Sequence, residues 1–262
     1  MTPWILIVLV GGCKKPPEAP KKLDELTHYL YREWGNEDPD VVAVGLENLQ
    51  DFFRGVELDP DEHVLDRSWE LTSIERKDLA DVDWPDDRNP ADTYGVAVAR
   101  QSDWPVEAHA DWQLEDDQLP AEPSAATYVR NYPDMDDPEC FVDRSCDVLF
   151  TSNEIERQNL LMSLEYTLDK RMRWVELSNG DFAILSRAIV AESTEGKSGK
   201  STIWQSYSMD VWLPKGKKTD RMQVLWSEAD VAGASDAIQI GTVKSSTDDH
   251  FVATDEAIAG VR

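Results

Sequence analysis

Basic residues are scarce in this chain of 262 residues: 26 Lys and Arg stand against 52 Asp and Glu, a formal net charge of −26. Nucleic-acid binding needs a basic surface that displaces the counterions of the phosphates, so this class of function is excluded. A transmembrane helix is excluded too, because the apolar run 4–10 has seven residues and a membrane span needs about 20. The acidity itself indicates a well-solvated surface, with calcium or a basic partner as the alternative explanation.

Catalytic motifs are also missing. The chain has four histidines but no His-Glu-x-x-His, no Gly-x-Ser-x-Gly elbow and no phosphate-binding glycine loop. Gly199-Lys200-Ser201 looks like the end of such a loop, but Gly196 stands only three residues before Gly199, and this spacing favours a hairpin. The sequence therefore predicts no cofactor and gives no motif for an enzyme. A hydrolase that uses a pair of carboxylates stays an alternative.

Cysteine occurs three times, and two of the three lie close together. Cys140 and Cys146 are separated by five residues, close enough to close a small loop, and in an exported chain the expected state of such a pair is a disulfide. Two thiols with no nearby histidine make a poor zinc site. The Cys-x-x-Cys spacing of redox proteins is absent. We predict a structural disulfide and no metal.

The third cysteine ends the motif Val10-Gly11-Gly12-Cys13, directly after the apolar run 4–10. This segment resembles the signal peptide and lipobox of bacterial lipoproteins. The resemblance implies that residues 1–12 are removed and that Cys13 carries the lipid, palmitate included. It also implies anchoring to the bacterial cell envelope. Lys14, where an aspartate is associated with retention at the inner membrane, favours the outer membrane, at its periplasmic face or at the cell surface.

Residues 13–22 predict a tether rather than a folded segment, because they are rich in proline and lysine and have no apolar periodicity. Residues 23–262 are expected to form a single globular domain. Its helical and irregular part covers 23–150, and its antiparallel sheet covers 151–262.

Two helices are predicted at the start of this domain. Leucines and a tryptophan at helical spacing predict the first over 23–34. Asp38 offers a cap and Pro39 a first helical residue for the second, which runs to about 54. The segment 56–92 is rich in Asp, Pro and Asn, which indicates surface turns. Calcium binding by these acidic loops is the alternative left open.

Strands dominate the second half. Short apolar runs at 94–99 and 125–129 come first, and period-two alternation then begins near residue 162. Asn179-Gly180 predicts a hairpin whose return strand covers 182–190. Further strands are expected at 203–213, 222–226 and 238–243. A short closing helix is expected after a cap at 246–249.

The predicted fold class is α+β: a long-stranded, curved antiparallel β-meander over about 160–243, packed with an N-terminal helical pair and a short C-terminal helix. Both sheet faces carry apolar residues, so both are expected to be covered, one by the helices and the other by loops from 56–150. We expect a non-catalytic binding domain for an apolar ligand or lipid. The expected ligand-binding residues are aromatic and lie on the sheet: Trp174, Trp204, Tyr207, Trp212 and Trp226. The alternative is an interaction or assembly subunit of a cell-envelope complex, with a basic protein partner.

Overall fold

A computed structural model describes most of the chain from the second half of the expected tether onward. The described residues are 17–56, 58, 63–82, 84–85, 87–133, 135–158, 163–190, 192–197, 199–231 and 233–261. Cys13 and the expected signal peptide lie outside them. In the described part of the chain, no helix is both long and apolar enough to cross a membrane.

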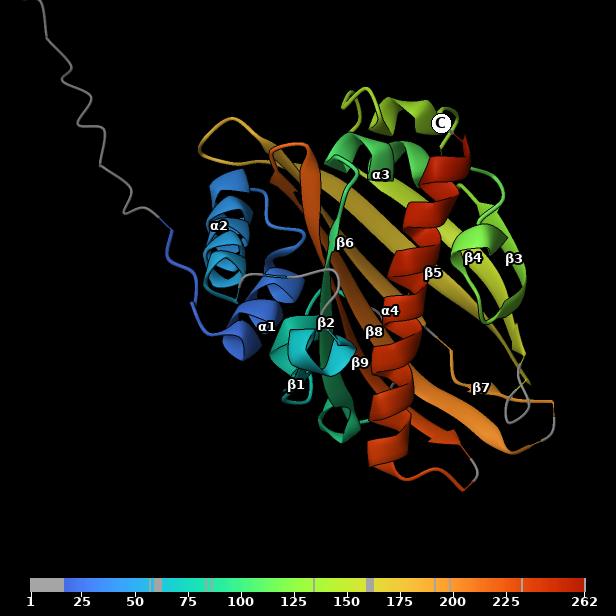
Figure 1. Ribbon diagram of the computed structural model, residues 1–262. Helices are drawn as coiled ribbons and strands as arrows, with labels where there is room; N and C mark the ends of the chain where they lie inside the picture. Colours follow the sequence, from blue (N-terminus) through green and yellow to red (C-terminus); the bar gives the residue numbers. More distant parts are fainter. Residues whose placement is uncertain are drawn as a thin grey trace, which may run out of the picture.

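The described residues form one antiparallel sheet of nine strands (Figure 1). The strands are Ser68–Leu71 (β1), Tyr94–Ser102 (β2), Ala125–Asn131 (β3), Leu149–Gln158 (β4), Ser163–Glu176 (β5), Phe182–Val190 (β6), Thr194–Glu195 (β7), Ser201–Lys215 (β8) and Lys218–Val231 (β9). Their order is β1-β2-β9-β8-β6-β5-β4-β3, and β7 pairs with β8. From β3 to β9 each long strand pairs with the next long strand of the chain, which confirms the predicted meander.

Tight turns join the long strands of this meander, the first of them at the predicted place. β5 and β6 are joined at Asn179-Gly180, where Gly180 has a φ of 83°. β8 and β9 are joined at Gly216, which has a φ of 66°. Positive φ of this size is easily adopted only by glycine, so these two residues determine the register of their hairpins.

Four helices complete the described fold: Leu23–Glu33 (α1), Pro39–Val56 (α2), Val106–Trp112 (α3) and Asp236–Val261 (α4). α1 and α2 are the predicted N-terminal pair, and α2 begins at the predicted proline. Their apolar stripes contact each other and one face of the sheet. The α+β fold class predicted from the sequence is confirmed.

Two boundaries predicted from the sequence are wrong. Residues 238–243 are not a strand, because α4 begins at Asp236, ten residues before the expected cap at 246–249. Ile240, Val243 and Phe251 recur at helical spacing and pack on β2, so the β-branched residues that suggested a strand form the start of a helix face. The division at residue 150 also fails, because β1, β2 and β3 belong to the same sheet as the later strands.

The helices cover opposite faces of the sheet. α1 and α2 lie on one face, and α4 crosses the other (Figure 1). α3 and the segment 103–148 complete the covering beside α4. Coverage of both faces was predicted, but the second face was assigned to loops alone, without α4.

Candidate functional site

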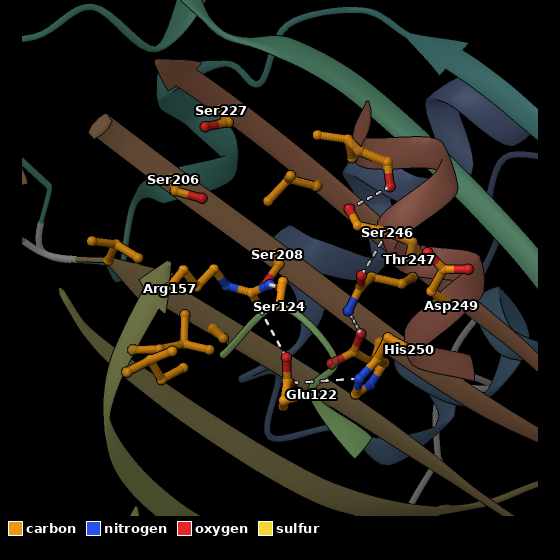
Figure 2. A pocket seen from close by; sticks show the side chains of 18 of the residues that line it. Glu122, Ser124, Arg157, Ser206, Ser208, Ser227, Ser246, Thr247, Asp249 and His250 are labelled. Atoms are coloured by element: carbon orange, nitrogen blue, oxygen red, sulfur yellow. Dashed lines mark hydrogen bonds and ion pairs between the residues drawn. The ribbon is translucent and has the colours of Figure 1, made fainter. Parts of the chain in front are cut away.

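Large and small side chains alternate along the long strand β8. Tyr207, Met209 and Val211 are buried against the α1–α2 side of the sheet. Their neighbours Ser206 and Ser208 project to the side of α4 (Figure 2). A bulge between Ile203 and Gln205 shifts the register, so that Ile203 lies on the same side as the serines. The face under α4 therefore carries small residues in the middle of the sheet.

These small residues leave a cavity of about 510 Å³ between α4 and the sheet. Ala188 on β6 and Ser227 and Ala229 on β9 extend the row of small side chains. Larger apolar residues form the walls; they include Leu168, Val190, Leu225, Val231, Ile238 and Val243. The volume falls in the range of small-molecule sites, which are typically about 300–1,000 Å³.

One charged cluster stands at the β4 side of the cavity (Figure 2). The Arg157 guanidinium donates to Tyr166 Oη at 2.6 Å, to Glu122 Oε2 at 2.9 Å and to the Ser124 hydroxyl. His250 on α4 donates from Nδ1 to the Ala121 carbonyl at 2.6 Å. Burial opposes the charge of Arg157, but Tyr166 and Glu122 outweigh it and raise the pKa of the guanidinium. This cluster joins β4, β5, α4 and the segment before β3.

A second charged cluster stands on the sheet under α4. Lys170 Nζ lies 2.7 Å from Asp210 Oδ2, and Gln223 Nε2 donates to Asp210 Oδ1 at 2.8 Å. Thr247 on α4 donates to the side-chain carbonyl of Gln223 at 3.0 Å. Burial alone would raise the pKa of Asp210, but the Lys170 ammonium and the hydrogen bonds from Lys170 and Gln223 hold it below its usual range. Asp210 is thus a carboxylate whose charge is fully matched.

The third cluster lies where the C-terminal part of α4 meets β9. Arg221 donates to Asp255 Oδ2 at 2.8 Å, and Ser102 donates to Asp255 Oδ1 at 2.7 Å. Burial lowers the pKa of Arg221 to about 10 and raises the pKa of Asp255. Two buried polar atoms of cavity residues have no hydrogen-bond partner among the described residues: Arg221 Nε and Gln239 Oε1.

A second hollow, of about 560 Å³, lies on the other side of β4 and β5 and is acidic. Its carboxylates are Glu154, Glu156, Glu165, Asp169 and Glu192. Lys197 lies 2.9 Å from Glu156 and 2.5 Å from Glu165. The described residues contain no group of three or more His, Cys, Asp or Glu side chains that could hold a metal ion.

The acidic loops of 56–92 are described only in part. Within them Asp81 pairs with Arg187 at 2.8 Å, and the side chain of Asn89 caps a short helical turn. Asp83 and Asp86 lie outside the described residues. Calcium binding here stays an untested alternative.

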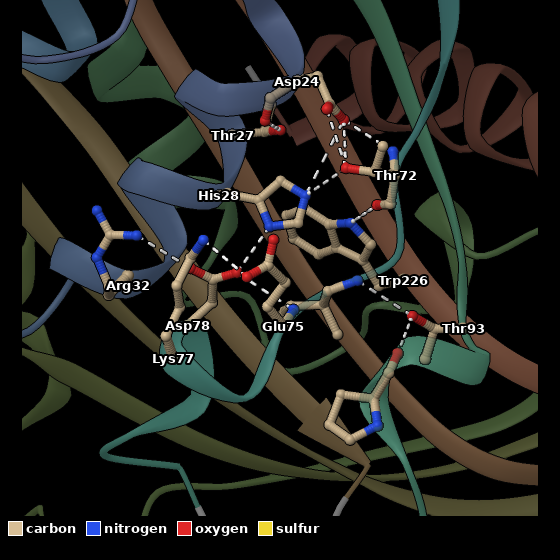
Figure 3. Close-up of polar contacts among 12 residues, drawn as sticks. Asp24, Thr27, His28, Arg32, Thr72, Glu75, Lys77, Asp78, Thr93 and Trp226 are labelled. Carbon is tan, nitrogen blue, oxygen red and sulfur yellow. Dashed lines mark hydrogen bonds and ion pairs between the residues drawn. The ribbon is translucent and has the colours of Figure 1, made fainter.

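A polar cluster around His28 lies at the opposite face, between α1 and the segment after β1 (Figure 3). His28 Nδ1 lies 2.7 Å from Asp78 Oδ2, and His28 Nε2 lies 3.2 Å from Thr72 Oγ1. The Thr72 hydroxyl donates to the Asp24 carboxylate at 2.9 Å. The order Asp–His–Thr is that of a hydrolase triad, but none of these residues lines the cavity. Their contacts connect α1 to the segment 72–78.

The five aromatic residues predicted to bind a ligand lie in different parts of the structure. Trp212 lines the cavity. Tyr207 and Trp226 are fully buried in the core on the α1–α2 side, because alternation along β8 and β9 points them away from α4. Trp174 stacks on Phe141, and Trp204 packs under Arg88, both outside the cavity lining.

The predicted disulfide is confirmed: Cys140 and Cys146 are bonded, with Cα atoms 5.3 Å apart. The residues that sequence reasoning missed are the charged members of the cavity, above all Arg157, Lys170, Asp210 and Glu122. One signal was available. Small residues at 206 and 208 alternate with large residues at 207 and 209, and such a pattern indicates unequal filling of the two faces.

No family model and no curated protein matches this chain. Some solved structures are similar to it in their backbone fold. A STAR-related lipid transfer protein from Xanthomonas axonopodis has a TM-score of 0.44 and 11% identity over 64% of this chain and 87% of its own. A protein from Thermus thermophilus has a TM-score of 0.43 and 12% identity over 64% and 98%. A START superfamily protein from Mycobacterium smegmatis has a TM-score of 0.40 and 8% identity over 64% and 99%. These likenesses are too distant to assign a ligand.

Proposed function

We propose that this chain is a membrane-anchored, non-catalytic binding domain that holds an apolar ligand or lipid between α4 and the sheet. The observation that carries the proposal is the cavity of about 510 Å³ with its row of small residues. Ligand sites are concave and mainly apolar, with a few placed polar groups. The cavity has this character: apolar walls on several strands and three charge-matched polar clusters.

The anchoring part of the proposal rests on the sequence, through the lipobox that ends at Cys13. One structural feature agrees with a tether there. Asn48 on α2 donates to the carbonyls of Ala19 and Pro20, at 3.0 and 2.9 Å. The end of the tether is thus held on the α2 side of the domain, opposite to α4. A lipid at Cys13 would leave the cavity side directed away from the anchor.

The anchor is tested by labelling cells with a radioactive fatty acid. The wild-type chain should incorporate label and fractionate with the outer membrane. The Cys13→Ala variant should lose both properties. Unchanged labelling of the variant would contradict anchoring and leave the cavity proposal intact.

The cavity is tested by filling it. Ser206 points into the cavity, so Ser206→Trp should occupy the ligand volume (Figure 2). Thr167 is exposed, and its neighbours Tyr166 and Leu168 line the cavity. Thr167→Trp therefore places the same side chain on the opposite side of the sheet and serves as control.

Native mass spectrometry of protein purified from its own host is the measurement. We expect bound lipid on the wild type and on Thr167→Trp, and at least about tenfold less on Ser206→Trp, because the tryptophan removes the volume that the ligand needs. Absence of any bound molecule on the wild type, together with no binding of an apolar fluorescent probe, would contradict the proposal.

The alternative function is that of an interaction subunit in a cell-envelope complex. The acidic hollow on the outer side of β4 and β5 supports it, since its carboxylates suit a basic partner. Cross-linking in cells separates the two functions. Recovery of one basic protein, lost when Glu154 and Glu156 are changed to Gln, would favour the alternative.

A further inference from the structure

Most of the cations that line the cavity pair with a carboxylate of the protein. Among the described residues, four Lys and Arg side chains line it. Arg157, Lys170 and Arg221 each pair with a carboxylate, at 2.9, 2.7 and 2.8 Å. An anionic ligand would have to displace one of these carboxylates or add an unbalanced charge, and both cost free energy in a poorly solvated site.

The fourth cation, Arg130, donates its hydrogen bonds to neutral acceptors. Its guanidinium donates to Asn153 Oδ1 at 3.0 Å, to Tyr128 Oη at 2.9 Å and to the Gln113 carbonyl. An anion at this position would compete with three hydrogen bonds that are already made. Each of the four cations therefore already has a partner, and of their buried nitrogen atoms only Arg221 Nε has no acceptor among the described residues.

Gln239, in contrast, presents an acceptor that no described residue uses. It lies in the first turns of α4, is 9% exposed and lines the cavity, and its Oε1 has no hydrogen-bond partner. Ile238, Leu225 and Val243 are apolar members of the same lining. A buried acceptor among apolar groups is unfavourable until a donor reaches it.

We propose that the ligand is an uncharged amphiphile with a hydrogen-bond donor, and that Gln239 Oε1 accepts the hydrogen bond from that donor. The inference rests on the proposed function, because it names the chemistry of the molecule held in the same cavity. Gln239 is thus a specificity-determining residue, and a long-chain alcohol or amide is the class of ligand that it selects. Hydroxyls of Ser206 and Ser208 provide further neutral contacts on the sheet.

Four probes that share a ten-carbon chain and differ in the head group test this inference: decanol, decyl methyl ether, decanoate and decylammonium. Each displaces neutral N-phenyl-1-naphthylamine from the purified chain at pH 8. Decanol should bind at least about tenfold more tightly than either ion, since moving a charge out of water into this cavity is costly. It should bind about five- to tenfold more tightly than the ether, which has no donor for Gln239.

Variants test whether Gln239 causes the preference for decanol. Gln239→Leu should remove the preference for decanol over the ether, and Gln239→Glu should shift preference to decylammonium. Gln50→Leu makes the same change on α2, away from the cavity, and should behave as wild type. Because Gln239→Leu removes an unpaired buried acceptor, its melting temperature without ligand should be equal to or above that of the wild type.

Each contrary outcome has a distinct meaning. A chain that binds neither the naphthylamine nor any amphiphile contradicts the proposed function itself. Binding of all four probes with equal affinity, or a decanol preference that survives in Gln239→Leu, contradicts the role of Gln239 alone. Preference for decanoate that disappears in Arg130→Met would overturn the uncharged ligand and assign an anion to Arg130.

Discussion

Neighbouring residues of β8 and β9 point to opposite faces of the sheet, and the two faces are filled in different ways. On the α1–α2 side stand Tyr207, Met209 and Trp226, all fully buried. On the α4 side the same strands carry Ser206 and Ser208, beside the cavity. One face is packed by large side chains, and the other keeps open volume from the same stretch of chain.

The closed face, the one packed by α1 and α2, also has a polar cluster, built around one fully buried carboxylate. Asp78 is 0% exposed and receives hydrogen bonds from Arg32 Nη1 at 3.0 Å and from the Glu75 amide at 3.2 Å, with His28 Nδ1 at 2.7 Å (Figure 3). Trp226 lies against the ring of His28 at 5.3 Å and donates to the Thr72 carbonyl. These polar and apolar contacts together hold α1 in one position on the sheet.

The difference between the two faces of the sheet explains how one small domain can contain a cavity. Native stability is a small difference between large terms, so empty volume on one face requires dense packing elsewhere. The α1–α2 face provides that packing. The α4 face can then keep small residues and a hydrogen-bonding atom that no described residue satisfies.

The largest expected effect comes from breaking the closed face. Trp226→Ala should lower the free energy of unfolding by about 3–5 kcal/mol, because it leaves a large void in a filled core. Trp204→Ala is the matched control. Trp204 is only partly buried, packs under Arg88 at 4.0 Å and donates to Asp230, so about 1 kcal/mol is expected. Urea unfolding measures both, and equal losses would contradict the difference between the two aromatics.

The next effect depends on pH. Burial alone would raise the pKa of Asp78, but the hydrogen bond from His28 and the nearby positive charges hold it below its usual range. Stability from this carboxylate is therefore present above about pH 4 and is lost as the pH falls and it becomes protonated in the folded state. Asp78→Asn should cost about 3 kcal/mol at pH 7 and should flatten the loss of stability in acid.

Asp51, exposed and paired with Arg54 on α2, provides the control for Asp78. Asp51→Asn should change the free energy of unfolding by less than about 0.5 kcal/mol. Urea unfolding from pH 7 to pH 3 gives the comparison. If Asp78→Asn and the wild type lose stability in parallel below pH 4, Asp78 does not stabilise the closed face through its charge.

The helices of the closed face and one hairpin of the sheet could be predicted from the sequence. Leucine spacing and Pro39 define α1 and α2, and Asn179-Gly180 defines a hairpin, because these signals act over a few residues. Gly95 had no such signal. A Cβ there would lie 2.9 Å from Trp226 Cδ1 and 2.9 Å from the Thr72 carbonyl, so its need for glycine arises only when β1, β2 and β9 meet.

The cavity face was much less predictable. Arg157 meets Glu122 across 35 residues and Arg221 meets Asp255 across 34, and in an acidic chain no local pattern separates these pairs from surface charges. α4 was mistaken for a strand at 238–243 because the β-branched residues outweighed the helical spacing. Aromatic residues of the sheet were predicted as ligand contacts, whereas small residues make the cavity.

The disulfide should matter for one face only. Replacing both Cys140 and Cys146 by Ser should cost about 2–3 kcal/mol, the loop-closure value for so small a ring. Phe141, inside this ring, packs with Trp212 and Met172 on the cavity side. Amide exchange should therefore accelerate in the segment 133–148 and in the facing parts of β5 and β6. Equal acceleration in α1 and α2 would contradict the separation of the two faces.

The sharpest test uses two adjacent residues of β9. Val224 is fully buried on the closed face, and Leu225 lines the cavity. Val224→Ala should cost about 2 kcal/mol, because two methyl groups leave a packed core. Leu225→Ala removes more atoms but should cost less than about 1 kcal/mol, since its side chain already borders open volume.

Ligand binding should reverse that order. Leu225→Ala should weaken binding of decanol about threefold to tenfold through lost apolar contacts, and Val224→Ala should leave it unchanged in the folded protein. Probe displacement and urea unfolding on the same two variants give the result. If Val224→Ala destabilises the protein less than Leu225→Ala does, the space under α4 is closed by side chains in solution, and both faces are equally packed.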